Sequence, residues 1–192
     1  MFEQIKEFEF LILDGIQQIK NPILDNIFLF ITKLGNSGIL WITIAILMLF
    51  FAKYRKTGVL TLVSLALVSV VFTLLMKNLV ARERPYTYIE GILAFDEMSV
   101  GIPAHDTFSF PSGHSVTSFA AATCIFIRHK KLGIACYGVA LLISFSRLYM
   151  YVHFPSDVIC GAIFGILSAL VVNFVEGKLS ERIRKRAKKN RE

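Results

Sequence analysis

Apolar blocks close to the length of a membrane-spanning helix constrain the fold of this chain more than any other feature. Five such blocks run along the sequence: Gly38–Ala52, Thr57–Val80, Ser115–Ile127, Leu132–Met150 and Val158–Val175. A helix needs about 20 apolar residues to cross a bilayer core, so the first and third blocks must take in flanking residues. Hydrophobic residues make up 55% of the 192 positions, which is more than an ordinary soluble domain carries. These features predict an all-α integral membrane bundle, with about five transmembrane helices in a single domain.

The N-terminal region predicts short helices that lie on the membrane rather than cross it. Apolar residues recur there at helical spacing: Ile5, Phe8, Ile12, Ile16 and Ile19. Polar residues fill the other faces, which is typical of an amphipathic helix at the bilayer surface. A second helix is expected from Pro22 to Leu34, where the segment Gly35–Gly38 breaks it. Its roughly 12 apolar-rich residues are too few for a crossing, although a six-span alternative threads this segment through the membrane.

Basic residues gather in three segments, at 53–56, at 128–131 and in the tail after residue 177. The tail holds +6 of the formal net charge of +7. A basic run can bind nucleic acid, but beside a final membrane helix it favours a cytoplasmic anchor near anionic lipid. With five spans, all three segments fall on one side of the membrane, and the positive-inside rule makes that side cytoplasmic.

This topology predicts a multi-pass cell-membrane protein with a cytoplasmic C-terminus and no nucleic-acid partner. We expect interfacial helices over 1–35, a transmembrane core over 38–176 and a basic cytoplasmic tail over 177–192. The segment 81–114 and the turn around His153 then fall on the extracytoplasmic face. These segments carry the histidine, arginine and aspartate side chains described next.

The densest group of such side chains lies near the end of the chain. Ser146-Arg147 is followed after five residues by His153, and Asp157 comes four residues later. Pro155 marks the start of the last helix, so His153 lies at its mouth and Asp157 one turn inside. The carboxylate can then reach one imidazole nitrogen, fix the tautomer and leave the other nitrogen free to act. Taken alone, this pattern also fits an interfacial histidine and a carboxylate that stabilises a helix N-terminus.

Two further segments carry polar residues at predicted helix ends. Residues 111–114, Pro-Ser-Gly-His, begin an apolar run, and the free N–H groups of a helix N-terminus favour a bound anion. Lys77 and Arg84 are seven residues apart, and they share a helix face if the helix persists until Pro85 ends it. Each segment alone also fits a capped helix or cations at a membrane interface.

In this order and spacing, the three segments resemble the signature of the type 2 phosphatidic acid phosphatase family. That signature is a Lys separated by six residues from Arg-Pro, then Pro-Ser-Gly-His, then Ser-Arg with His and Asp at the spacing found here. Every position is matched between Lys77 and Asp157. The resemblance implies a helical-bundle membrane enzyme that removes phosphate from lipids without a metal or other cofactor.

The resemblance also implies a role for each matched residue. His153 would be the nucleophile that forms a phosphohistidine, Asp157 would orient it, and His114 would protonate the leaving oxygen. Another set would bind the phosphoryl oxygens: Lys77, Arg84, Arg147, Ser112 and Gly113, with Arg82 as a secondary candidate. Cations can replace a metal ion in stabilising phosphoryl transfer, and we expect no metal site.

The small size of the chain is similar to that of bacterial lipid phosphatases acting on undecaprenyl diphosphate, phosphatidylglycerol phosphate or phosphatidate. The expected partners are therefore a lipid phosphate and membrane lipids, and the loop 86–107 is expected to shape headgroup choice. A lipid-phosphate phosphotransferase and a non-catalytic lipid-binding protein are the alternatives. A non-catalytic relic should have lost the nucleophile or the acid, and both histidines are present.

Overall fold

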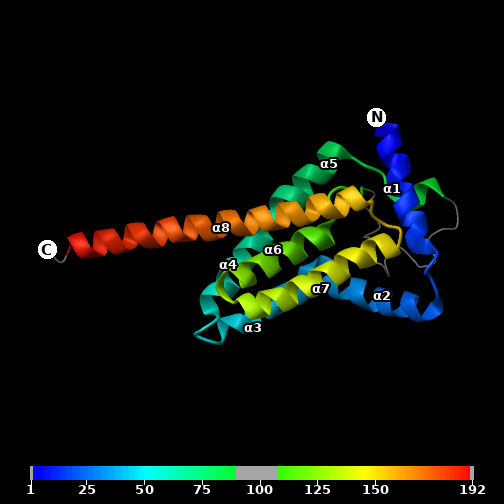
Figure 1. The fold of residues 1–192 in the computed structure, drawn as a ribbon. Helices are drawn as coiled ribbons and strands as arrows, with labels where there is room; N and C mark the ends of the chain where they lie inside the picture. Colours follow the sequence, from blue (N-terminus) through cyan, green and yellow to red (C-terminus); the bar gives the residue numbers. More distant parts are fainter. Residues whose placement is uncertain (1, 90–107, 191–192) are drawn as a thin grey trace.

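Helices make up almost all of the architecture in the computed structural model, which describes residues 2–89 and 108–190 (Figure 1). An isolated β-bridge joins Glu83 and Phe108. The elements in chain order are α1 (Phe2–Gln17), α2 (Pro22–Gly35), η1 (Asn36–Gly38), α3 (Ile39–Leu49), α4 (Arg55–Val68), η2 (Ser69–Met76), α5 (Lys77–Val80), η3 (Pro85–Tyr88), α6 (Gly113–Arg128), α7 (Lys130–Tyr149) and α8 (Pro155–Lys189). The helical class predicted from the apolar blocks is confirmed.

Helix α6 lies at the centre of the bundle and packs against α4, α7 and α8. Its buried positions are dominated by small residues, including a run of three alanines at 120–122. Two glycines of α8 meet this surface: a Cβ at Gly165 would lie 2.3 Å from the Val116 carbonyl oxygen, and one at Gly161 would lie 2.9 Å from that of Ser112. Small residues let helix backbones approach closely inside a membrane. The N-terminal parts of α6 and α8 therefore pack closely against each other.

In the part of the chain that the structure describes, three helical runs are long and apolar enough to cross a membrane, namely Pro22–Leu49, Lys130–Tyr149 and Pro155–Lys189. The first is divided at η1, where Ser37 and Gly38 have φ of 51° and 67°. Between the first and second of these runs, α4, η2 and α5 follow one another without a break. A membrane bundle is thus confirmed, while the number of five crossings stays a prediction.

The two N-terminal helices form where the sequence predicts them. The Asn21 side chain accepts hydrogen bonds from the amides of Ile23 and Leu24 at the start of α2. Both helices, however, also pack on the protein: α1 contacts α7 and α8, and α2 contacts α7. Leu13 of α1 is fully buried beside Tyr151. The first 35 residues are therefore part of the bundle wall as well as an amphipathic surface.

The bundle has two distinct polar ends. At one end, Glu176 of α8 pairs with Lys56 and Arg128, and Thr57 hydrogen-bonds His129. At the other end, the start of α8 meets the start of α6 and the end of α7 (Figure 1). The basic loops thus lie opposite the three motif segments. Helix α8 runs past the bundle and carries the basic tail away from it (Figure 1).

One local expectation is wrong: the helix that contains Lys77 does not persist to Pro85. It ends at Val80, because Ala81 takes a left-handed conformation with φ of 47°. Arg84 is extended, with φ −81° and ψ 150°, as expected for a residue before proline. Lys77 and Arg84 therefore do not share a helix face, and a short extended segment carries Arg84 to the site.

Candidate active site

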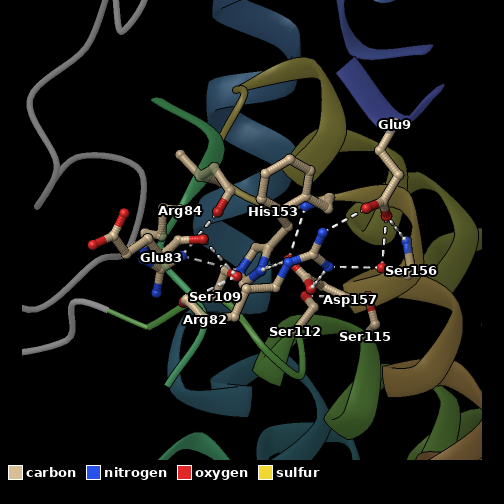
Figure 2. A network of polar contacts seen from close by, with 12 residues as sticks. Glu9, Arg82, Glu83, Arg84, Ser109, Ser112, Ser115, His153, Ser156 and Asp157 are labelled. Carbon is tan, nitrogen blue, oxygen red and sulfur yellow. Dashed lines mark hydrogen bonds and ion pairs between the residues drawn. The ribbon is translucent and has the colours of Figure 1, made fainter. Parts of the chain in front are cut away.

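The three motif segments meet at one end of the bundle, where hydrogen bonds join them. The Ser112 amide donates to the Asp157 carbonyl oxygen at 3.1 Å, which joins the start of α6 to the start of α8. Arg84 Nη1 donates to the Val152 carbonyl oxygen at 3.0 Å, which joins the extended segment to the turn before α8. Segments far apart in the sequence thus form one polar cluster (Figure 2).

His153 lies in the turn between α7 and α8 and is almost fully buried. Its Nε2 is 3.3 Å from Arg84 Nη1, and its Nδ1 is 3.6 Å from Asp157 Oδ2. The same Oδ2 accepts from the Phe154 amide at 2.8 Å, which fixes the carboxylate. The Nδ1 distance is longer than a hydrogen bond, as is common for catalytic pairs in free enzymes. This arrangement directs the Nδ1 proton to Asp157 and leaves Nε2 facing the cationic side.

The surroundings of His153 also favour its neutral form. Burial and then the positive charges of Arg84, Arg147 and Lys77 hold the pKa of His153 well below 6.5, the ordinary value of histidine. A buried imidazole among cations resists protonation because the imidazolium would lose hydration and meet like charge. His153 is therefore an unprotonated base near neutral pH, as a nucleophile must be.

His114 is buried in the first turn of α6 and is held by the N-terminal part of the chain. Its Nε2 lies 3.2 Å from the Thr32 carbonyl oxygen and 3.0 Å from Asn36 Oδ1. A carbonyl oxygen can only accept, so the hydrogen of the neutral ring is on Nε2. Arg147 Nη1 donates to the hydroxyl of the same Thr32. The end of α2 thus positions two of the residues that the motif predicts.

The predicted phosphate-binding residues surround this cluster. Arg84 and Arg147 are only 2% and 1% exposed, and buried ionisable residues in membrane proteins indicate a functional site by default. Ser112 is fully buried. Among the described residues, a Cβ at Gly113 would meet no atom within 4 Å, so no described side chain covers the first turn of α6 there. Lys77 is near enough to His153 to act on it electrostatically.

Arg82, the secondary candidate for phosphate binding, instead binds carboxylates. Its Nη1 donates to Asp157 Oδ1 and to Ser156 Oγ, each at 2.7 Å, and its Nη2 donates to Glu9 at 2.5 Å (Figure 2). Its guanidinium also stacks on the Phe154 ring at 3.9 Å. Arg82 therefore supports the start of α8 and the carboxylate that faces His153.

Sequence reasoning missed the side chains that the N-terminal helices contribute. They are Glu9, Asp14, Asp25, Thr32 and Asn36. Asp14 and Asp25 accept hydrogen bonds from the hydroxyls of Tyr151 and Tyr149, which flank the turn that leads to His153. A signal for Glu9 was present, because it lies four residues after Ile5 and three before Ile12, inside the apolar stripe. The loop 86–107, expected to shape headgroup choice, lies outside the described residues from 90 onward.

Comparison with known proteins bears on the whole arrangement. A family model described as the PAP2 superfamily matches residues 57–179. An undecaprenyl-diphosphatase of Sulfolobus acidocaldarius is 32% identical over 143 residues, which cover 74% of this chain and 66% of that protein. Phosphatidylglycerophosphatase B of Bacillus subtilis is 29% identical, and the match covers 84% of this chain and 79% of that protein. The bacitracin transport permease protein BcrC of Bacillus licheniformis is 43% identical over 72 residues, 38% of this chain and 36% of that protein.

Solved structures show the same fold. The crystal structure of a transmembrane PAP2-type phosphatidylglycerolphosphate phosphatase from Bacillus subtilis superimposes with a TM-score of 0.72 at 26% identity, covering 91% of this chain and 87% of that one. The LpxE protein of Aquifex aeolicus shares the fold with a TM-score of 0.68 at 24% identity, over 85% and 93% of the two chains. The family model, the relatives and the matched motif positions agree, and the chain belongs to the PAP2 superfamily.

Proposed function

We propose that this protein is a lipid phosphatase that hydrolyses a membrane lipid phosphate or diphosphate through a phosphohistidine, without a metal ion. One observation carries the proposal: a buried His153 stands between Asp157 on its Nδ1 side and Arg84 on its Nε2 side. A base held in one tautomer next to buried cations is suited to attack an anionic phosphoryl group.

In the first step, His153 Nε2 attacks phosphorus, and the bond from phosphorus to the lipid or diphosphate oxygen breaks. When the anionic substrate binds, the neutral His114 ring takes up a proton from water on Nδ1. It gives this proton to the leaving oxygen, and Asp157 stabilises the charge that develops on the His153 ring. In the second step, water attacks the phosphohistidine while His114 takes its proton. Inorganic phosphate then leaves and His153 returns to its neutral form.

Arg84, Arg147 and Lys77 supply the charge that such a transition state needs. Phosphoryl transfer depends mainly on positioning and on electrostatic stabilisation of the equatorial oxygens. Ser112 and the Gly113 amide add hydrogen-bond donors at a helix N-terminus, where an anion is favoured. Within residues 2–89 and 108–190, no group of three His, Cys, Asp or Glu side chains is placed to hold a metal ion.

The substrates that we propose are undecaprenyl diphosphate, phosphatidylglycerol phosphate and phosphatidate. Relatives are named undecaprenyl-diphosphatase and phosphatidylglycerophosphatase B. Because the basic loops lie at the opposite end of the bundle, we place the site on the extracytoplasmic face, at the level of the lipid headgroups.

The test is phosphate release by the purified protein in detergent from these three lipids, with EDTA present throughout. We expect release from at least one lipid, and inhibition by vanadate, which mimics trigonal-bipyramidal phosphorus. The His153→Ala variant, prepared in the same way, is the background control. Release that requires an added divalent cation, or release that is equal in His153→Ala, would contradict the proposal. Binding of the lipids without turnover would favour a lipid-binding protein instead.

A further inference from the structure

Helix α1 contacts the start of α8 through the carboxylate of Glu9. Glu9 is only 4% exposed, and its two oxygens have separate partners. Oε1 accepts from the Ser156 amide at 2.9 Å and from the Ser156 hydroxyl at 2.6 Å. Oε2 accepts from Arg82 Nη2 at 2.5 Å. Figure 2 shows Glu9 beside Ser156, with the Arg82 guanidinium between Glu9 and Asp157.

The Ser156 contacts fix the start of α8. The first amides of a helix have no partner within the helix, so an outside acceptor stabilises that end. Asp157 satisfies the Phe154 amide from within α8, and Glu9 satisfies the Ser156 amide from α1. His153 precedes this first turn and Asp157 lies within it, so their relative placement depends on the turn.

The Arg82 contacts affect the charge of the His153–Asp157 pair. Asp157 has one oxygen toward Arg82 and the other near His153 Nδ1. An arginine bound to Asp157 alone would draw its negative charge away from the imidazole. Glu9 binds the other side of the same guanidinium, so the two carboxylates share one cation. Arg82 therefore neutralises less of the Asp157 charge, and that charge acts more strongly on the His153 imidazole.

We propose that Glu9 is a positioning residue for His153, acting through Arg82 and the first turn of α8. This role rests on the proposed phosphatase function, and it makes α1 part of the catalytic support. A shift of the nucleophile by about 1 Å can cost roughly 100-fold in rate. We therefore expect Glu9→Gln, which keeps the size and one acceptor oxygen, to lower kcat roughly 10- to 100-fold with KM nearly unchanged. Glu7→Gln is the matched control, since Glu7 is an exposed neighbour on the same helix.

A second measurement needs no turnover and separates this inference from the proposed function. The ring-nitrogen NMR signals of His153 are recorded in isotope-labelled protein in detergent, with His129 as the internal reference at the other end of the bundle. In Glu9→Gln, Asp157 is the one charged partner left for Arg82 among these contacts. Arg82 should then draw more of the Asp157 charge and weaken the interaction of Asp157 with His153 Nδ1–H. Arg82→Ala removes the cation from Asp157 and should strengthen the interaction of Asp157 with His153 Nδ1–H. The two variants should therefore move the His153 Nδ1 signal in opposite directions and leave His129 unchanged.

The outcomes are distinct. Opposite shifts support the positioning role even if no lipid phosphate is hydrolysed, in which case only the proposed function fails. Absent shifts, or shifts in the same direction, overturn the positioning role. In an active enzyme, a Glu9→Gln variant that loses thermal stability while keeping wild-type kcat would show that Glu9 only holds α1 in place, and would overturn it as well.

Discussion

The two histidines of the site are oriented through different ring nitrogens, Nδ1 in His153 and Nε2 in His114. His153 has Nδ1 on the side of Asp157, and its Nε2 faces Arg84. His114 has Nε2 on the Thr32 carbonyl, so its Nδ1 is the nitrogen left for proton transfer. The identities of both histidines could be predicted from the motif spacing. The tautomer of His114 could not, because Thr32 and Asn36 lie about 80 residues earlier in the sequence and belong to no motif.

At the residue scale, the low pKa of His153 gives a direct prediction. In the free protein in detergent, His153 should titrate well below pH 6.5, since burial and nearby cations oppose its charged form. Below pH 6.5, the native state should bind fewer protons than the unfolded chain, so the free energy of unfolding should fall as the pH drops. Histidine NMR titration, assigned with His153→Asn, measures the midpoint. A midpoint at or above 6.5 would show that the surrounding cations do not act on this ring as described.

A second residue-scale prediction concerns the open space beside Gly113. An added methyl group there meets no atom of residues 2–89 and 108–190 within 4 Å, so Gly113→Ala should fold normally and keep its thermal stability. If the Gly113 amide borders the bound phosphate, the methyl group should weaken vanadate inhibition, by roughly tenfold for the loss of about 1.4 kcal/mol. Gly138→Ala, also without a neighbour within 4 Å and far from the motif segments, is the control. Unchanged vanadate affinity in Gly113→Ala would remove this residue from the phosphate site.

At the scale of the elements, the packing of α8 on α6 sets the position of the site. A Cβ at Gly165 would lie 2.3 Å from the Val116 carbonyl oxygen and 2.8 Å from the Ala120 amide nitrogen. Gly165→Val should therefore separate the two helices and destabilise the fold by about 1–3 kcal/mol, the usual cost of overpacking. Thermal unfolding in detergent measures this loss, and Gly177→Val, which has open space, is the control. Equal stability of the two variants would mean that close α6–α8 contact is unimportant.

The sequence allowed most of the elements to be predicted, and the failures have physical causes. Hydrophobic blocks and flanking Pro and Gly residues indicated the helices, including the start of α8 at Pro155. The break after Val80 was missed, because Ala81 is an ordinary helix former that here takes a left-handed conformation. The docking of α1 was missed because an amphipathic pattern does not distinguish a bilayer from a protein surface. Glu9 shows the difference, since a carboxylate within an apolar stripe needs a buried partner.

At the scale of the whole molecule, the opposition of the two polar ends predicts sidedness. Ile89 is 36% exposed and follows η3 at the site end, whereas Lys53 is exposed in the basic loop. In a cysteine-free background, Ile89→Cys should react with an impermeant maleimide in intact cells, and Lys53→Cys should react only after the membrane is opened. The positive-inside rule is the physical reason. The reverse pattern would place the site on the cytoplasmic face.

The most direct test of the central claim is to trap the phosphoryl group on His153. The protein is mixed with a radiolabelled, activated aryl phosphate in EDTA, quenched rapidly and assayed for protein-bound label. We predict acid-labile, alkali-stable label on the wild type and none on His153→Ala. His114→Ala should still be labelled, and should keep the label longer, because an activated leaving group needs no proton while water still needs a base. Acid-labile label on His153→Ala would contradict the assignment of the nucleophile.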